Sequence, residues 1–88
     1  MLLVVSNISL APNPAIDMVT LTLETTSNTE LQVRFLSSTG VQSDQFVPVV
    51  QGVNTLRFST KSFPAGVYTI ALRQGNDLQT VRMVKVSE

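Results

Sequence analysis

Hydrophobic and polar residues alternate along most of this chain. In residues 19–24, the sequence VTLTLE places Val19, Leu21 and Leu23 on one face and polar side chains on the other. The segments ELQVRF, NTLRFS and VYTIAL repeat this pattern. A period of two with a β-branched or aromatic bias is typical of half-buried antiparallel strands. No stretch has the 3.6-residue spacing of an amphipathic helix, so the pattern predicts an all-β domain.

Turn compositions separate these runs at regular intervals: TTSNT, SSTG, QGVN, SFPAG and QGND. In SFPAG, Pro64 presets the first central torsion, and Ala65 favours a type I turn because it disfavours positive φ. In QGND, Gly75 can supply the positive φ of a hairpin turn. Short strands between closely spaced turns indicate an antiparallel β-sandwich. We expect about seven strands, at roughly residues 2–10, 18–24, 30–36, 41–48, 53–58, 67–73 and 78–86.

Three of these strands show irregularities that are typical of sheet edges. The first is broken or edge-like, and Pro48 cannot donate to a ladder, so the fourth strand is an edge strand or ends there. In the last strand, Arg82 shares a face with valines while Lys85 shares the other with Val81 and Met83. Both faces are mixed, which predicts a bulge or an exposed edge. Exposed edges would also allow the isolated domain to form a homodimer.

A stiff corner, APNPA, precedes the strand at 18–24. Pro12 and Pro14 lack amide donors, and the residues before them are pushed toward extended conformations. Asn13 and Asp17 have short polar side chains that can cap nearby amides. We interpret the corner as an extended crossing that carries the chain from one sheet to the other. This structural role is favoured over direct contact with a ligand.

The composition excludes some classes of function but does not identify one. The 88 residues form one domain, residues 1–88, in which 14% of residues are charged, where about 25% is usual. Six basic and six acidic residues balance, which leaves no electrostatic argument for binding nucleic acid or an anionic membrane. The opening MLLVVSN is too short for a signal-peptide core or a membrane span. An exported form would therefore carry its amino-terminal signal on a longer precursor.

The sequence offers little for catalysis or cofactor binding. It has no cysteine and no histidine, which removes thiolate metal sites, disulfides and the commonest general base. Nucleophile-elbow, phosphate-loop and dinucleotide motifs are absent, and no Asp/Asn cluster is dense enough for calcium. Tyr68 is expected to be a core ring with a satisfied hydroxyl. An aromatic platform for sugar binding would need this ring or one of the four phenylalanines, Phe35, Phe46, Phe58 and Phe63. Most of these phenylalanines are at inward positions of the alternation. We expect no enzyme activity, cofactor or small-molecule substrate.

Four sequence elements occur in an order that resembles a known family. They are P-N-P-A-x-D (Pro12, Asn13, Pro14, Ala15, Asp17), ELQVRFLSSTG ending at Gly40, FPAGVYTIAL with Gly66 and Tyr68, and the hairpin LRQGNDLQTVRMVKVSE with Gly75. Over about 80 residues the chain is similar to the carboxy-terminal sorting domain of proteins exported by the type IX secretion system of Gram-negative bacteria. The resemblance implies an immunoglobulin-like sandwich of seven strands.

The same resemblance implies a role as a folded export signal at the tail of a larger protein. In this family the translocon of the outer membrane recognises the domain, and a cysteine-protease sortase commonly removes it and couples the cargo to surface lipopolysaccharide. The cargo would pass through the periplasm and the outer membrane to be secreted or displayed on the cell surface. The residues that match the family elements, with Arg82 and Lys85 of the last strand, are the candidate recognition residues.

We also infer from the mixed last strand that the hairpin 66–86 is an accessible edge. Its backbone and the Arg82/Lys85 pair would contact the translocon, because unpaired edges invite strand addition. The simpler reading is that this hairpin only completes the sandwich. An alternative function is an accessory β-sandwich that binds carbohydrate or mediates adhesion for its parent protein.

Overall fold

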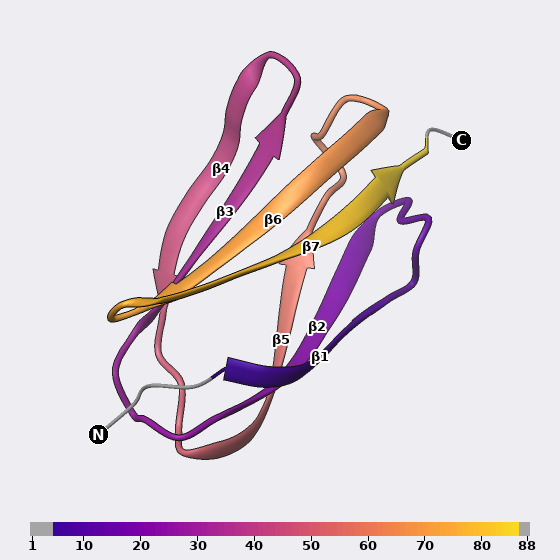
Figure 1. Cartoon of the computed structure of the whole chain (residues 1–88). Helices are drawn as coiled ribbons and strands as arrows, with labels where there is room; N and C mark the ends of the chain where they lie inside the picture. Colours follow the sequence, from indigo (N-terminus) through magenta and orange to yellow (C-terminus); the bar gives the residue numbers. More distant parts are fainter. Residues whose placement is uncertain (1–4, 87–88) are drawn as a thin grey trace.

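The structure, a computed structural model, describes residues 5–86 as two antiparallel β-sheets packed face to face (Figure 1). Within these residues there are seven strands and no helix, which confirms the all-β sandwich. The strands are β1 (Val5–Ala11), β2 (Met18–Thr25), β3 (Leu31–Ser37), β4 (Gly40–Val47), β5 (Gly52–Ser59), β6 (Gly66–Gln74) and β7 (Asp77–Lys85). No helix in this part of the chain is long and apolar enough to cross a membrane.

The strand order is β1-β2-β5 in one sheet and β4-β3-β6-β7 in the other. An immunoglobulin constant domain groups its first, second, fifth and fourth strands, and its third, sixth and seventh. Here the fourth strand lies beside the third instead. The arrangement is therefore an immunoglobulin-like sandwich in which the fourth strand has changed sheets.

The irregular strands are edge strands, as their sequences predict. β1 has a register shift between Ser6 and Ser9, and Asn7 within it has a φ of 52°. β4 ends at Val47, directly before Pro48. β7 pairs with β6 without a register shift from Gly66–Lys85 to Gln74–Asp77, so it is an edge strand and contains no bulge in this ladder. The predicted first strand also included residues 2–4, which lie outside the described residues.

The corner does not carry the chain between sheets, and that prediction was wrong. It joins β1 to β2, and these strands are antiparallel neighbours in the same sheet. The prolines stiffen the corner, but they cannot specify which sheet receives the next strand, because that choice depends on pairing with β5 far along the chain.

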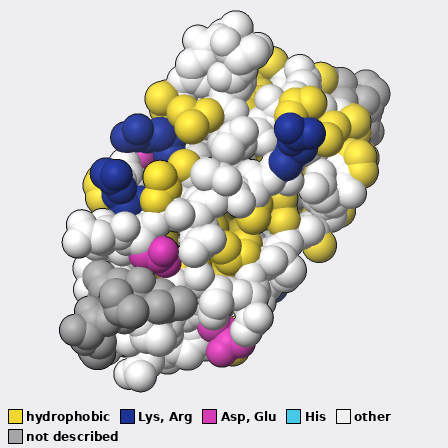
Figure 2. All heavy atoms as spheres, viewed as in Figure 1, with side chains coloured by type: hydrophobic (Ala, Val, Ile, Leu, Met, Phe, Trp, Pro, Cys, Tyr) yellow, Lys and Arg dark blue, Asp and Glu magenta, His cyan; other side chains and the backbone are white. Residues whose placement is uncertain are grey.

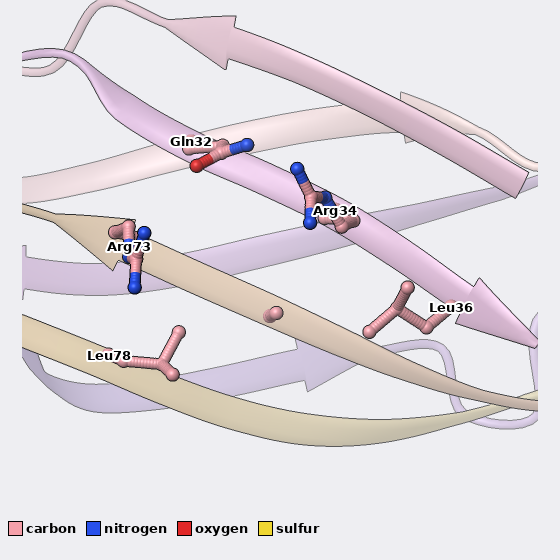
Figure 3. Close-up of a pocket in the computed structure, with 6 residues that line it drawn as sticks. Gln32, Arg34, Leu36, Arg73 and Leu78 are labelled. Atoms are coloured by element: carbon pink, nitrogen blue, oxygen red, sulfur yellow. The ribbon is translucent and has the colours of Figure 1, made fainter. Parts of the chain in front are cut away.

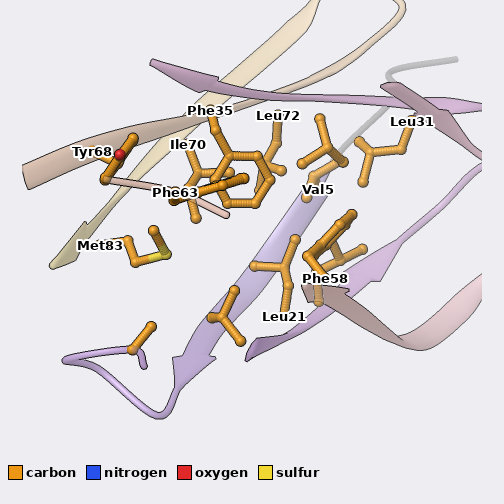
Figure 4. Packing of buried hydrophobic residues seen from close by; sticks show 14 of the residues in the cluster. Val5, Leu21, Leu31, Phe35, Phe58, Phe63, Tyr68, Ile70, Leu72 and Met83 are labelled. Atoms are coloured by element: carbon orange, nitrogen blue, oxygen red, sulfur yellow. The ribbon is translucent and has the colours of Figure 1, made fainter. Parts of the chain in front are cut away.

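The core lies between the two sheets and contains the inward side chains predicted by the alternation (Figure 4). Leu21 and Leu23 of β2 and Leu31, Val33 and Phe35 of β3 are fully buried. The Phe35 ring meets the rings of Phe58 and Phe63 edge-on, at centroid distances of 5.5 and 5.2 Å. Burying one such large apolar side chain contributes about 1.5–3 kcal/mol. This core fixes the relative positions of the loops at the two ends of the sandwich.

Candidate functional site

One end of the sandwich collects most of the candidate recognition residues. Figure 1 shows the corner (residues 12–17), the β3–β4 turn, the β5–β6 loop and the carboxyl end of β7 at the same end of the molecule, while the β6–β7 turn is at the other. A small hollow of about 160 Å³ touches both the β3–β4 turn and the β5–β6 loop, which confirms that these segments are neighbours. We refer to this region as the corner end.

At the corner end, the side chain of Asn13 pairs with the outer edge of β7. Its Nδ2 donates to the Arg82 carbonyl oxygen at 3.1 Å, and its Oδ1 accepts from the Val84 amide at 3.0 Å. A primary amide offers one donor and one acceptor in the same spacing as a peptide group. Asn13 therefore takes the place of one residue of a neighbouring strand.

Ala15 continues this pairing through its backbone. Its amide donates to the Val84 carbonyl at 2.7 Å, and its carbonyl accepts from the Val86 amide at 2.9 Å, in a parallel bridge to Lys85. The methyl group of Ala15 is completely buried. We call these four hydrogen bonds, made by Asn13 and Ala15 to residues 82–86, the seam. The seam occupies the part of the β7 edge that the sequence reading treated as open for strand addition.

The corner is also held by the loop that follows β5. The Thr60 amide donates to the Asp17 carbonyl at 2.9 Å, and the Thr60 hydroxyl donates to the Ile16 carbonyl at 3.3 Å. Thr60 is completely buried. Asp17 itself is exposed, and no hydrogen bond or ion pair involves its carboxylate within residues 5–86. Asn13 therefore caps a backbone amide as expected, although that amide is 71 positions away in the sequence. Asp17 does not act as a cap; it contributes a backbone carbonyl.

Both prolines of the corner are exposed. The Ala11–Pro12 and Asn13–Pro14 peptide bonds are cis. Neither proline has an N–H group that would need a partner, so the exposed stretch places no unsatisfied amide on the surface at these positions. The corner end thus presents two pyrrolidine rings beside the Asn13 side chain.

Arg82 and Lys85 are on opposite faces of β7, as the sequence pattern predicted, but the structure exposes only one of the two expected contact residues. Arg82 is exposed, whereas Lys85 is only 5% exposed and is on the inward face with Met83. In a strand, residues separated by an odd number of positions point to opposite faces, so the two cations cannot share one surface. Arg82 alone is available for contact with a partner.

Tyr68 is a core residue with a satisfied hydroxyl, as predicted. It is 2% exposed, its hydroxyl donates to the Pro64 carbonyl at 2.5 Å, and its ring lies 5.5 Å from that of Phe63. Burial raises the pKa of the Tyr68 hydroxyl, because the interior disfavours the phenolate. The bond from Tyr68 to Pro64 ties the β5–β6 loop to the sheet, so the role of this ring is to shape the corner end from inside.

The three candidate glycines are in turns or at strand starts rather than in contact with the seam. Gly40 ends the β3–β4 turn with a φ of 127°, and Gly66 begins β6 opposite Lys85. Gly75, with a φ of 60°, is the first residue of the two-residue β6–β7 turn, where a hairpin turn favours glycine. Gly75 therefore lies away from the corner end, and its role is to close the hairpin.

Sequence reasoning missed one buried polar cluster. Gln74 is 1% exposed; its Oε1 accepts from the Thr25 hydroxyl at 2.5 Å and its Nε2 donates to the Thr29 carbonyl at 2.6 Å. The sequence QGND reads as a turn, yet Gln74 is the last residue of β6 and points inward. Its inward direction could have been found by extending the alternation of Tyr68, Ile70 and Leu72 by one step. The cluster connects the two sheets at the end opposite the corner end.

The geometry favours recognition over chemistry. Within residues 5–86, no three His, Cys, Asp or Glu side chains are placed to hold a metal ion. The corner end instead presents two exposed prolines, the side-chain amide of Asn13 and the exposed Arg82. The edge of β7 at this end is covered by the seam. These groups give the corner end a distinct shape and polar surface atoms.

Comparison with protein-family models identifies a family for this chain. The model of a family described as the secretion system C-terminal sorting domain matches residues 9–86. The match thus covers nearly the whole chain, and it includes the corner near its start and the end of β7 at its close. A search of curated proteins finds no match.

Proposed function

Because this chain belongs to the secretion system C-terminal sorting domain family, we propose that it directs an attached cargo protein through the type IX secretion machinery and across the outer membrane. The observation that supports this proposal best is the family match over residues 9–86, which spans both sides of the seam. The folded domain acts as the export signal, and the attached cargo protein carries any biochemical activity.

We further propose that the machinery reads the corner end. Pro12, Pro14 and Arg82 are exposed there beside Asn13. Tyr68 supports this end from inside, and Gly66 is exposed at the start of β6. Recognition by addition of a strand to residues 82–86 would first require the seam to open, because Asn13 and Ala15 already use the outward amides and carbonyls. The intact seam is therefore the recognised feature, with its exposed side chains as the contact points.

Removal of the domain by a sortase, and attachment of the cargo to surface lipopolysaccharide, belong to the same proposal. They follow from family membership. The product expected in the medium or at the cell surface is then a cargo without these 88 residues.

The alternative function, a carbohydrate-binding or adhesive accessory module, finds less support. Sugar-binding sites commonly use exposed aromatic faces for stacking, and four of the five aromatic residues are at most 9% exposed: Phe35, Phe58, Phe63 and Tyr68. Phe46, at 63%, is the exception. One ring on an edge strand does not form a stacking platform.

The test is an export experiment with a reporter enzyme. The reporter carries a periplasmic export signal and this chain at its carboxyl end, and it is expressed in a bacterium that has a type IX system. We expect activity at the cell surface or in the medium, and periplasmic retention in a host that lacks the translocon. Equal export from both hosts would refute the proposed function. The intact mass of the exported reporter shows whether the domain has been removed; a full-length product would refute the sortase step alone.

Arg82→Ala tests the corner end within this assay. Lys85→Ala is less informative, because Lys85 is buried and its truncation would disturb packing. The matched control is Arg57→Ala, which removes an exposed arginine from the outward face of β5 in the other sheet. We expect the first variant to lower export and the second to leave it unchanged. Equal export from both variants would contradict recognition through Arg82.

A further inference from the structure

The outward face of the four-stranded sheet is positively charged, although the chain is neutral overall. The face consists of the residues that alternate with buried Leu31, Val33 and Phe35 of β3 and with their partners. On the described strands it carries three arginines, Arg34, Arg73 and Arg82, and one carboxylate, Asp44. Figure 2 shows basic side chains interspersed with hydrophobic ones on the upper part of the visible face, with acidic atoms beside the basic group at upper left and further acidic side chains lower down. The surplus of positive charge is specific to this sheet.

A hollow of about 260 Å³ lies in this face, between two of the arginines. Its lining is Gln32, Arg34 and Leu36 from β3, Ala71 and Arg73 from β6, and Leu78 from β7. Ala71 is opposite Arg34, and Arg73 is opposite Gln32. Figure 3 shows the polar groups of Gln32, Arg34 and Arg73 around the hollow, with Leu36 and Leu78 as apolar walls. The short side chain of Ala71 leaves the space between the two guanidinium groups unfilled.

The two arginines are incompletely neutralised. Arg34 Nη2 donates to Asp44 Oδ2 at 2.9 Å, while Gln32 Nε2 donates to Asp44 Oδ1 at 3.1 Å. The hydrogen bond from Gln32 and that from Arg34 lower the pKa of Asp44, so this carboxylate stays charged and balances one arginine. Arg73 has no ion pair or hydrogen bond through its side chain within residues 5–86. Diagonal neighbours on adjacent strands are close enough to interact, and like charges there repel.

Arg34 has a second unsatisfied feature. Its Nε is buried and has no hydrogen-bond partner among the described residues. A buried donor without an acceptor is unfavourable, particularly when it belongs to a charged group. This buried Nε is closed to solvent, so what Arg34 contributes to the hollow is a guanidinium group that shares one carboxylate, whereas Arg73 contributes an unpaired charge. An anionic acceptor in the hollow would balance the unpaired charge of Arg73 beside the Arg34 guanidinium.

We propose that this hollow binds the carboxylate of an aspartate or glutamate side chain presented by a partner protein. This inference rests on the proposed function, because a sorting domain must be bound by a protein of the secretion machinery. The carboxylate would bridge Arg34 and Arg73, and apolar residues next to it would contact Leu36 and Leu78. The contact lies on the outward sheet face, and the residues that line the hollow do not include those of the corner end.

The features of the hollow favour a protein carboxylate over a phosphate or an anionic lipid surface. Guanidinium groups bind carboxylates and phosphates alike in bidentate geometry. The two leucine walls favour the carboxylate, because they suit an apolar neighbour in a peptide. A phosphate site would gain from additional cations, but Asp44 lies beside Arg34 and would repel a doubly charged group. The zero net charge of the chain gives no general attraction to an anionic surface.

The binding test uses the whole 88-residue chain and nuclear magnetic resonance of the arginine Nε–H groups. The probe is the peptide acetyl-Leu-Glu-Leu-amide, with acetyl-Leu-Gln-Leu-amide as the neutral control and sodium phosphate as a third arm. We expect saturable shifts at Arg34 and Arg73 with the acidic peptide, and affinity at least about tenfold lower for the neutral one. Arg73→Gln should weaken binding by a similar factor, whereas Arg57→Gln should not. Shifts of equal size at Arg57, no saturation, or equal affinity for phosphate would overturn the proposal.

The export assay provides the second test. Ala71→Glu places a carboxylate in the hollow on the half-exposed outward face, where it pairs with both arginines and excludes the ligand; Ala71→Gln is its neutral counterpart. We expect Ala71→Glu and Arg73→Gln to lower export at least about tenfold and Arg57→Gln to leave it unchanged. Thermal unfolding of each purified variant identifies any that do not fold. Normal export of folded Ala71→Glu would refute the site, whereas failure of the unmodified fusion to export would refute the proposed function instead.

Discussion

Replacing Asn13 by alanine is the most direct test of the seam. The substitution removes the donor to the Arg82 carbonyl and the acceptor for the Val84 amide, and it leaves the two backbone bonds of Ala15 in place. A typical hydrogen bond contributes about 0.5–1.5 kcal/mol net. Two such bonds sum to about 1–3 kcal/mol. Water can replace Asn13 at the Arg82 carbonyl and at the Val84 amide, so we expect a loss of about 1–2 kcal/mol in the free energy of unfolding.

That loss is large enough to measure. For a domain of this size the total stability is on the order of 4–13 kcal/mol. A change of about 1–2 kcal/mol would lower Tm by roughly 4–16 °C. In urea it would move the midpoint by about 1 M, given a typical slope of about 1–2 kcal/mol per M. Far-ultraviolet circular dichroism or the fluorescence of Tyr68, the single tyrosine of the chain, can follow unfolding.

A local readout shows whether the seam is the cause. The amide of Val84 donates to Asn13 Oδ1, so its hydrogen exchange should become faster in Asn13→Ala than the loss of global stability alone explains. The control is Asn76→Ala, which removes an exposed asparagine from the β6–β7 turn, where it makes no side-chain hydrogen bond within the described residues. If Asn13→Ala unfolds at the same urea concentration as Asn76→Ala and Val84 exchange is unchanged, then Asn13 does not complete the β7 edge.

Three other substitutions test the interior. Gln74→Leu removes the donor to the Thr29 carbonyl and leaves the Thr25 hydroxyl only its longer, 3.4 Å hydrogen bond to the Ser27 carbonyl, which should cost about 1–3 kcal/mol in urea unfolding; wild-type stability would contradict the role of the cluster. Leu21→Ala should cost about 2–5 kcal/mol because Leu21 is fully buried, whereas Leu78→Ala, at a position 55% exposed, should change stability little; similar losses would contradict the packing described. Burial raises the Tyr68 pKa above its usual value of 10.0, so the unfolded chain ionises first as the pH rises. Stability should be complete below about pH 10 and fall as the pH rises from there through the folded pKa, a decline that Tyr68→Phe should abolish in unfolding measured at a series of pH values.

Local patterns predicted the strands well because the physics that selects them is local. Alternation in VTLTLE, ELQVRF and VYTIAL requires one buried face, whichever sheet the strand joins, and the structure buries the expected side chains. Pro48 likewise identified an edge strand through a missing donor that any ladder would need. These features depend on a few neighbouring residues, so one sequence is sufficient to find them.

The corner could not be predicted in the same way, because its partners are remote in sequence. The stiffness of APNPA was evident, but its connection to β7 depends on how two sheets pack, and Asn13 finds its partners 69 and 71 positions later. Lys85 was misplaced for a related reason: both faces of the last strand are mixed, so alternation gave no direction. The hollow between Arg34 and Arg73 is also invisible in sequence, since it arises where β3 and β6 pair.

The seam joins the first and last parts of the fold, and this has a consequence for the order of synthesis. Within the domain, the corner is synthesised before most of the strands. Its Asn13 side chain and Ala15 backbone can form their hydrogen bonds only after the final strand has been made. A polypeptide that stops before residue 82 would contain all the turns of the sandwich and would still lack the seam, because the partners of Asn13 and Ala15 would be missing. A receptor that contacts both sides of the seam would thus bind only domains whose synthesis is complete. It would do so without any contact with the cargo.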